Sequence, residues 1–179
     1  LDAADISAAD RQAMSDGAGL RAGYPVAQAQ VRIVNGEVVV AGPHVNTGYL
    51  DPARDAETKI REDGLIWHRT GDAARFDTAG RLWLLGRTGA IVDTPKGPLH
   101  PFAIETAARL WPGVTRAALS ETATGPVLVL EGAGVDLNEC RRRAQTFGLS
   151  DLRQVSAIPM DRRHRSKVDY SALARLLKR

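Results

Sequence analysis

Two charged residues fifteen positions apart could together hold a sugar. Asp72 ends the motif WHRTGD at 67–72, and Arg87 ends the motif LWLLGR at 82–87. The two oxygens of a carboxylate can accept both hydroxyls of a vicinal diol, such as the ribose of a nucleotide, and a nearby guanidinium is a second donor for the same ligand. The alternatives are an aspartate that only bonds backbone amides in a turn at Gly71, and an arginine that is only a surface cation.

A lysine near the end of the chain is the third candidate. Lys167 lies in the polar segment IPMDRRHRSKVDY at 158–170, just before an expected helix. It is either a solvated cation among other cations or a mobile lysine that enters a closed site. In such a site it would neutralise the charge that builds on a carboxylate and a phosphate in the transition state. A compact charge on a long flexible stem suits that task.

Other kinds of site find no support in the sequence. Four histidines and the single Cys140 form no zinc-like cluster, and no G-x-S-x-G elbow of a serine hydrolase occurs. His68 is expected to be a strand residue, and His164, among arginines, a surface residue. From Glu139 to the end, 11 basic residues face 4 acidic ones, a net +7 within a chain of net +3. Such a tail could meet nucleic acid, an anionic membrane surface or a phosphate-bearing small molecule, or be a solvated helix face. Basic and aromatic residues do not alternate there, so we expect no nucleic-acid partner.

Composition describes a globular chain. Hydrophobic residues make up 44% of the 179 residues and charged residues 25%, and no apolar run approaches the length needed to span a bilayer. The start, LDAADISAAD, lacks the basic and apolar regions of a signal peptide. A lone cysteine suits a reducing cytoplasm.

The first half reads as a small β subdomain that positions Asp72 and Arg87. We expect a helix to about Ser15, a hairpin of QVRIV and EVVVAG around Asn35-Gly36, and a short helix near PARDAETKI. LIWHRTGDAARFD reads as two strands around a glycine turn, and Thr78-Ala79-Gly80 as the turn before LWLLGR. These strands predict a β-barrel-like subdomain.

The second half alternates helices and strands. TGAIVDTPKGPLHP is typical of a hinge followed by an extended loop. A helix over Pro101–Leu110, strands VTRAALS and PVLVLEG, a helix between Asp136 and Gly148, a strand QVSAIP and a final helix from Asp169 or Ser171 follow. The fold class is therefore α+β: a β-barrel-like subdomain, then a small α+β lid with an open sheet and packed helices.

These motifs in this order, from GEVVVAGPHVNTGYL through WHRTGD, DTAGRLWLLGR and PFAIE to SKVDYSAL, are similar to the adenylate-forming (AMP-binding) acyl-activating superfamily. That group includes acyl-CoA synthetases, peptide-synthetase adenylation domains and luciferases. The resemblance implies a C-terminal portion of such an enzyme. Residues 1–86 would end the large domain, 87–90 would be the hinge, and 91–179 a small mobile lid that rotates between adenylation and thioester-forming poses.

The resemblance also assigns roles. Asp72 and Arg87 would hold the ribose, Gly89 would lie at the hinge, Gly97 on the loop facing a thiol acceptor, and Lys167 would drive adenylation. An ATP-dependent ligase would convert a carboxylic acid to acyl-AMP and pyrophosphate, then pass the acyl group to CoA or a carrier. Mg²⁺ would be bound mainly by a part N-terminal to Leu1, as would ATP through its phosphate loop, so we expect the chain alone to be inactive.

Three departures from the family pattern narrow the resemblance. Gly89 stands where the family has Asp or Lys, Pro98-Leu99 follow the loop glycine, and PMDRRHRSK is two residues longer than usual, with Ser166 in place of a glycine. This pattern most resembles the β-lactone synthetases of olefin biosynthesis and related fatty-acyl ligases, which implies a fatty acyl substrate and an internal hydroxyl as alternative acceptor. The competing class is a non-catalytic module that binds a nucleotide or a partner.

Overall fold

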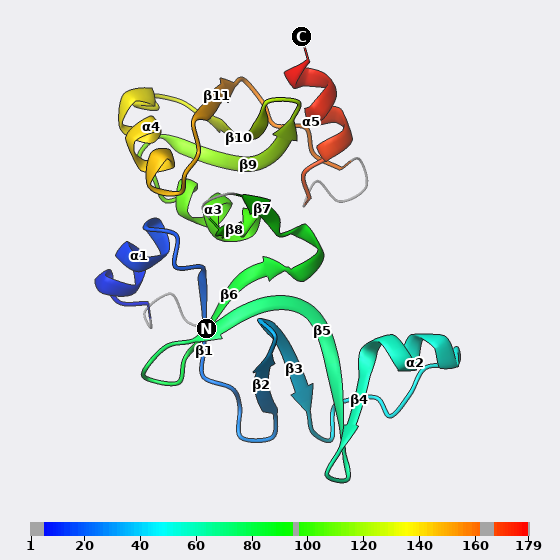
Figure 1. The fold of residues 1–179 in the computed structure, drawn as a ribbon. Coiled ribbons are helices and arrows are strands. Elements are labelled where there is room, and N and C mark those ends of the chain that lie inside the picture. Colours follow the sequence, from blue (N-terminus) through cyan, green and yellow to red (C-terminus); the bar gives the residue numbers. More distant parts are fainter. Residues whose placement is uncertain (1–5, 95–96, 162–166, 179) are drawn as a thin grey trace.

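The computed structural model describes residues 6–94, 97–161 and 167–178. Two β-sheets lie one above the other in Figure 1, with the hairpin β7–β8 and helix α3 between them and α1 at one side. The strands are β1 (Leu20–Gly23), β2 (Gln30–Val34), β3 (Glu37–Ala41), β4 (Lys59–Glu62), β5 (Leu65–Phe76), β6 (Leu82–Arg87), β7 (Val92–Thr94), β8 (Gly97–Leu99), β9 (Val114–Thr122), β10 (Gly125–Gly132) and β11 (Asp151–Val155). The helices are α1 (Ala8–Ser15), α2 (Pro52–Thr58), the 3-10 turn η2 (Thr88–Ala90), α3 (Pro101–Ala108), α4 (Leu137–Thr146) and α5 (Tyr170–Leu177).

The lower sheet is antiparallel and curled, in the order β1-β6-β5-β3-β2, with β4 paired to β5. The hairpin predicted at Asn35-Gly36 is confirmed, because both residues have positive φ (51° and 81°), as the tight turn between β2 and β3 requires. Edge strands β1 and β2 are not paired to each other in the described part of the chain, so the β-barrel-like subdomain is an open, curled sheet rather than a closed barrel.

The prediction of two strands around Gly71 is wrong. Residues 65–76 form one long strand, β5, which pairs with β4 at its beginning, with β6 at its end and with β3 between. Gly71 has φ +72° within this strand, and its N–H donates to the Glu37 carboxylate (2.9 Å) instead of to a neighbouring carbonyl. The glycine therefore bends the strand where the sheet curls instead of reversing the chain.

The upper sheet has the order β11-β10-β9, with β10 antiparallel to β9 and parallel to β11. Both faces of β10 are covered, which explains its uninterrupted apolar run. Leu128 and Leu130 pack in a core with Trp111 and the inner faces of α3 and α4, whereas Val127 and Val129 pack against Leu173 of α5 and its neighbours. The small open sheet with packed helices is confirmed.

Several boundaries differ from the prediction. The segment TGAIVDTPKGPLHP contains η2 and the hairpin β7–β8, because Val92 and Leu99 pair across it. Strand β11 begins at Asp151, three residues before the predicted QVSAIP. Capping by Asp136 and Asp169 is confirmed, since their side chains accept hydrogen bonds from the first-turn amides of α4 and α5. No helix in the described ranges is long and apolar enough to cross a bilayer.

Helix α1 connects the two sheets. Its cap is a reciprocal one, in which Ser7 and Asp10 bond each other's backbone amides. The Asp10 carboxylate is buried and pairs with Arg21 of β1 and with Arg81, both at 3.2 Å. At the other end of the helix, the Ser15 carbonyl accepts from the Trp111 indole at 3.4 Å. The helix thus contacts both the lower sheet and the core of the upper one.

Candidate active site

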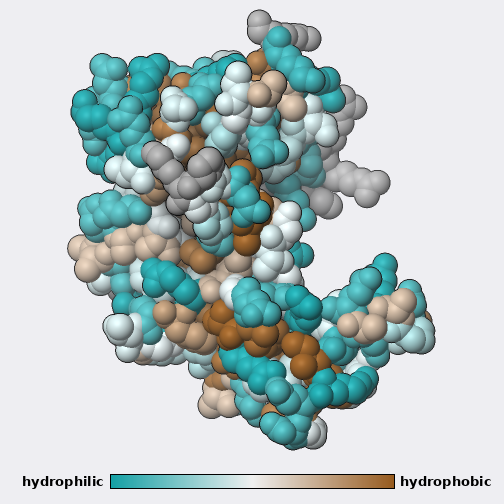
Figure 2. Space-filling view, in the orientation of Figure 1, coloured by the Kyte–Doolittle hydropathy of each residue, from teal (hydrophilic) through white to brown (hydrophobic). Residues whose placement is uncertain are grey.

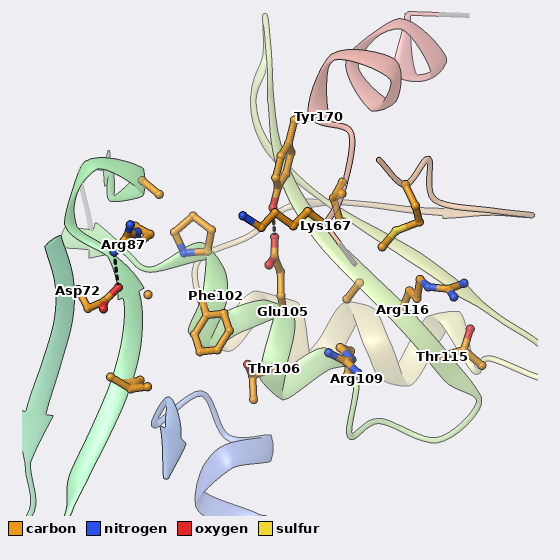
Figure 3. Close-up of a pocket in the computed structure, with 17 residues that line it drawn as sticks. Asp72, Arg87, Phe102, Glu105, Thr106, Arg109, Thr115, Arg116, Lys167 and Tyr170 are labelled. Carbon is orange, nitrogen blue, oxygen red and sulfur yellow. Dashed lines mark hydrogen bonds and ion pairs between the residues drawn. The ribbon is translucent and has the colours of Figure 1, made fainter. Parts of the chain in front are cut away.

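A cleft of about 1050 Å³ runs between the ends of β5 and β6 and the upper half of the molecule (Figure 3). Strands β5, β6 and β9, helix α3 and the segment around Lys167 all contribute to its walls. The residues that line it are Asp72, Leu84, Gly86, Arg87, Ala90, Pro101, Phe102, Glu105, Thr106, Arg109, Thr115, Arg116, Ala117, Met160, Lys167, Val168 and Tyr170.

Asp72 and Arg87 are direct neighbours across the β5–β6 ladder at the rim of this cleft. The Arg87 Nη1 donates to Asp72 Oδ1 at 3.0 Å and to the Thr70 carbonyl at 2.9 Å. Both side chains remain exposed, 69% for Arg87 and 40% for Asp72, so the pair faces the cleft instead of being sealed by packing. Among the described residues the Asp72 carboxylate bonds this guanidinium and no backbone amide, unlike a carboxylate that only closes a turn.

This pair is chemically suited to a nucleotide sugar. One oxygen of Asp72 is bonded to Arg87, and the other has no hydrogen-bonding partner in the described part of the chain. A carboxylate in that state can accept hydroxyl protons, and the guanidinium has further N–H groups to donate. The donor and acceptor set therefore fits a ribose diol.

Lys167 lies in the same cleft, on a short backbone anchor. Its N–H donates to the Asp161 carboxylate (3.0 Å), and its carbonyl accepts from the Asp161 N–H (2.8 Å). Met160 and Val168 form an antiparallel bridge beside this pair. The Lys167 side chain is exposed, and the described residues offer it no ion pair. Sequence positions 72, 87 and 167 are thus brought to one cleft from two different halves of the chain (Figure 3).

Two further side chains of the cleft were not singled out by the sequence. Glu105 Oε1 accepts from the Tyr170 hydroxyl and from the Leu119 N–H, both at 2.8 Å. Burial raises the pKa of the Glu105 carboxyl above its ordinary value, and burial together with Glu105 raises the pKa of the Tyr170 phenol. The motif PFAIE contains Glu105, but a tyrosine partner 65 residues away leaves no local signal.

The two glycines named from the sequence are not among the residues that line the cleft. Gly89 is inside η2, next to the cleft residue Ala90, and Gly97 begins β8 with φ +115° and open space around its Cα. Gly97 does not line the cleft. His68 lies in β5, as expected, with its ring 6.3 Å from that of Tyr49. His164 and Ser166 fall outside the described residues.

The described residues contain no set of side chains that could bind a metal ion. Over residues 6–94, 97–161 and 167–178, no group of three or more His, Cys, Asp or Glu side chains is arranged to hold a metal ion.

Together, the fold and the sequence define a class. The chain is a homologue of the C-terminal portion of adenylate-forming enzymes, and its curled antiparallel sheet followed by an α+β unit matches that part of them. No protein-family model matches the chain.

Individual relatives make the class concrete. The chain is 33% identical over 204 residues to the olefin β-lactone synthetase of Stenotrophomonas maltophilia, which covers 92% of the chain and 37% of that protein. It is 32% identical over 108 residues to the 2-succinylbenzoate–CoA ligase of Bacillus cereus, covering 55% of the chain and 22% of the ligase. The fold matches O-succinylbenzoate coenzyme A synthetase of Bacillus subtilis in complex with AMP, with TM-score 0.67 and 21% identity over 86% of the chain and 35% of that structure. The matched regions thus cover between 22% and 37% of the length of these relatives.

Proposed function

We propose that this chain works within an ATP-dependent, acyl-adenylate-forming ligase of the cytoplasm. The observation that carries the proposal is the shared cleft, in which the Asp72–Arg87 pair and Lys167 face the same space. The reaction joins a carboxylic acid to AMP. A carboxylate oxygen attacks the α-phosphorus of ATP, the bond from that phosphorus to the bridging oxygen breaks, and pyrophosphate leaves.

Each of the three residues has a distinct task in this proposal. Asp72 accepts the two ribose hydroxyls, and Arg87 donates to the same nucleotide. Lys167 neutralises charge on the carboxylate and the α-phosphate as it grows, which lowers the barrier because the stabilisation is strongest in the transition state. Bound Mg²⁺ would neutralise part of the phosphate charge, and we propose that residues outside this chain hold it.

The acceptor of the activated acyl group separates two versions of the function. The general version transfers the acyl group to the thiol of CoA or of a carrier. The second version is a β-lactone synthetase acting on β-hydroxy acids, in which the substrate's own hydroxyl attacks the acyl-AMP and expels AMP. It is favoured by the 33% identity over 92% of the chain to an olefin β-lactone synthetase, and it implies a fatty acyl substrate. Incubation with a β-hydroxy acid and ATP, with and without CoA, followed by mass analysis for lactone and thioester, distinguishes the two.

The role of Lys167 is tested in the full-length protein by Lys167→Ala. We expect ATP–pyrophosphate exchange to fall about 100-fold or more, because a transition-state contact is removed. Transfer or cyclisation starting from supplied acyl-AMP should stay near the wild-type rate. Lys178→Ala is the matched control, since Lys178 caps the far end of α5 and does not line the cleft. Equal losses in both half-reactions would contradict the assigned role.

A further inference from the structure

Glu105 joins three elements through one atom. Its Oε1 accepts one hydrogen bond from the backbone of β9 at Leu119 and one from Tyr170, the first residue of α5, while Glu105 itself belongs to α3. Lys167, Glu105 and Tyr170 line the same cleft, and in the view of Figure 3 the Lys167 side chain crosses the Glu105–Tyr170 hydrogen bond. A carboxylate that accepts two short hydrogen bonds inside a partly buried cleft fixes its partners closely, since bonds to a charged acceptor are about twice as strong as neutral ones.

We propose that Glu105 is a positioning residue for Lys167, acting through the Tyr170 hydroxyl. The inference rests on the proposed role of Lys167 in adenylation and names the residues that aim it. Tyr170 follows Lys167 by three residues, so a hydrogen bond that holds the start of α5 against α3 also restricts where the lysine can reach.

The other contacts of the lysine backbone do not supply this connection. The bonds between Asp161 and Lys167 join these two residues to each other and do not reach α3. Leu173, in the first turn of α5, is fully buried against β9 and β10, and Val168 packs on the same cluster, but that cluster contains no residue of α3. The Tyr170–Glu105 hydrogen bond is the described contact that ties the lysine end of α5 to α3.

Helix α3 in turn rests on the strand that carries Arg87. Gly86 has no room for a side chain, because an added Cβ would lie 2.6 Å from the Phe102 Cβ of α3. Phe102 therefore sits directly on the backbone next to Arg87. Helix α3 thus touches Gly86, the neighbour of Arg87, through Phe102 and binds Tyr170 through Glu105, so the placement of α3 relates the lysine to the proposed sugar-binding pair.

The competing explanation for Glu105 is structural. β9 is the edge of the upper sheet, and Glu105 satisfies the outward-facing amide of Leu119. A residue with that role alone would affect the stability of the fold and both half-reactions alike. A positioning residue would affect the half-reaction that uses Lys167 and spare the other.

Tyr170→Phe in the full-length protein separates these explanations, because it keeps the ring and the Glu105–Leu119 bond and removes only the hydroxyl. We expect the kcat of ATP–pyrophosphate exchange to fall about 10-fold, with the KM for ATP within about twofold of wild type. The rate from supplied acyl-AMP should not change. Glu105→Gln, which keeps an acceptor oxygen, should lose less than Glu105→Ala. Glu121→Gln, on an exposed position of β9, is the control and should behave as wild type.

Combining the variants tests whether Tyr170 acts through the lysine. Tyr170→Phe added to Lys167→Ala should cost nothing further in exchange activity, since there is no longer a lysine to aim. A wild-type exchange rate in Tyr170→Phe, equal losses in both half-reactions, or a fully additive loss in the double variant would overturn the proposal. If Lys167→Ala itself leaves the exchange rate unchanged, the proposed function fails. If Lys167→Ala lowers the rate and Tyr170→Phe does not, only the positioning role of Glu105 and Tyr170 fails.

Discussion

Asp77, at the turn between β5 and β6, accepts more hydrogen bonds than a surface turn needs. Its carboxylate receives the Trp83 indole N–H (2.9 Å), the Arg81 guanidinium (2.7 Å) and the backbone N–H groups of Ala79 and Arg81 (3.0 and 2.9 Å). The bond from Trp83 is the largest of the effects that hold the pKa of Asp77 far below its ordinary value. A carboxyl whose pKa is lower in the folded state than in the unfolded state raises the free energy of unfolding when it is ionised.

This arrangement predicts an acid-sensitive fold. The stabilisation from Asp77 is fully present above the ordinary aspartate pKa of about 3.9 and is lost as the pH falls below it toward the depressed folded value. We expect urea midpoints to be level from pH 7 to 5 and to drop below pH 4. Asp77→Asn should lower the midpoint at pH 7 and flatten its pH dependence. Asp10, whose pKa is also lowered, chiefly by its hydrogen bond with Ser7, should account for the pH dependence of stability that remains in this variant. If the urea midpoint of Asp77→Asn fell with decreasing pH as steeply as that of the wild type, this account would be contradicted.

At the residue scale, local chemistry was predictable and distant pairing was not. Asp136 and Asp169 could be recognised as caps because the rule involves amides two or three residues away. That Asp72 lies beside Arg87 could be anticipated, since a hairpin between them brings their strands together. The bond from Tyr170 to Glu105 depends on how α5 lies against α3, which neither segment encodes alone.

Among the elements, the contact of α3 with β6 depends on one glycine. Gly86 has φ +124°, and the Phe102 side chain occupies the space where a Cβ would stand. Gly86→Ala should therefore lower the free energy of unfolding by about 2 kcal/mol or more, from backbone strain and overpacking together. Gly80→Ala, at φ +78° with open space around it, should cost about 1 kcal/mol. Similar urea midpoints for the two variants would show that Phe102 can shift to accommodate the added methyl group at little cost in stability.

The elements also show where sequence patterns mislead. Alternation predicted the hairpin strands β2 and β3 and strand β6, the apolar run predicted β10, and helix caps indicated most helix starts. Gly71 was misread because a glycine with positive φ serves a turn and a strand bend equally well, and only pairing with β3 on one side and β4 and β6 on the other decides between them. The β7–β8 hairpin was read as a loop because its strands have three residues each.

On the scale of the whole molecule, α1 is the tie between the two halves. Figure 2 shows α4 as largely hydrophilic, with hydrophobic residues gathered over the lower sheet. Just after α1, the ring of Phe147, which stacks on Trp111 with ring centres 6.3 Å apart, leaves no room for a side chain at Gly17. A residue before the first sheet is thus packed against a helix more than a hundred residues later.

Phe147→Ala should loosen this tie. We expect a loss of about 2–3 kcal/mol in unfolding free energy, toward the low end for a large aromatic side chain because Phe147 is only partly buried. Amide hydrogen exchange in α1 should accelerate more than exchange in β2 and β3, which lie far from the contact. Leu176→Ala, on the exposed side of α5, is the control and should leave α1 unchanged. Uniform acceleration across the molecule would instead indicate that Phe147 supports only the upper core.

The backbone pairing of Asp161 with Lys167 bears on how such a chain can vary. These two residues bond each other directly, and Met160 bridges Val168 beside them, so positions 161 and 167 are held next to each other. We therefore expect a change in the number of residues between these two positions to leave the backbone of Lys167 in place. The two residues by which this sequence exceeds the usual pattern are therefore compatible with the role proposed for Lys167.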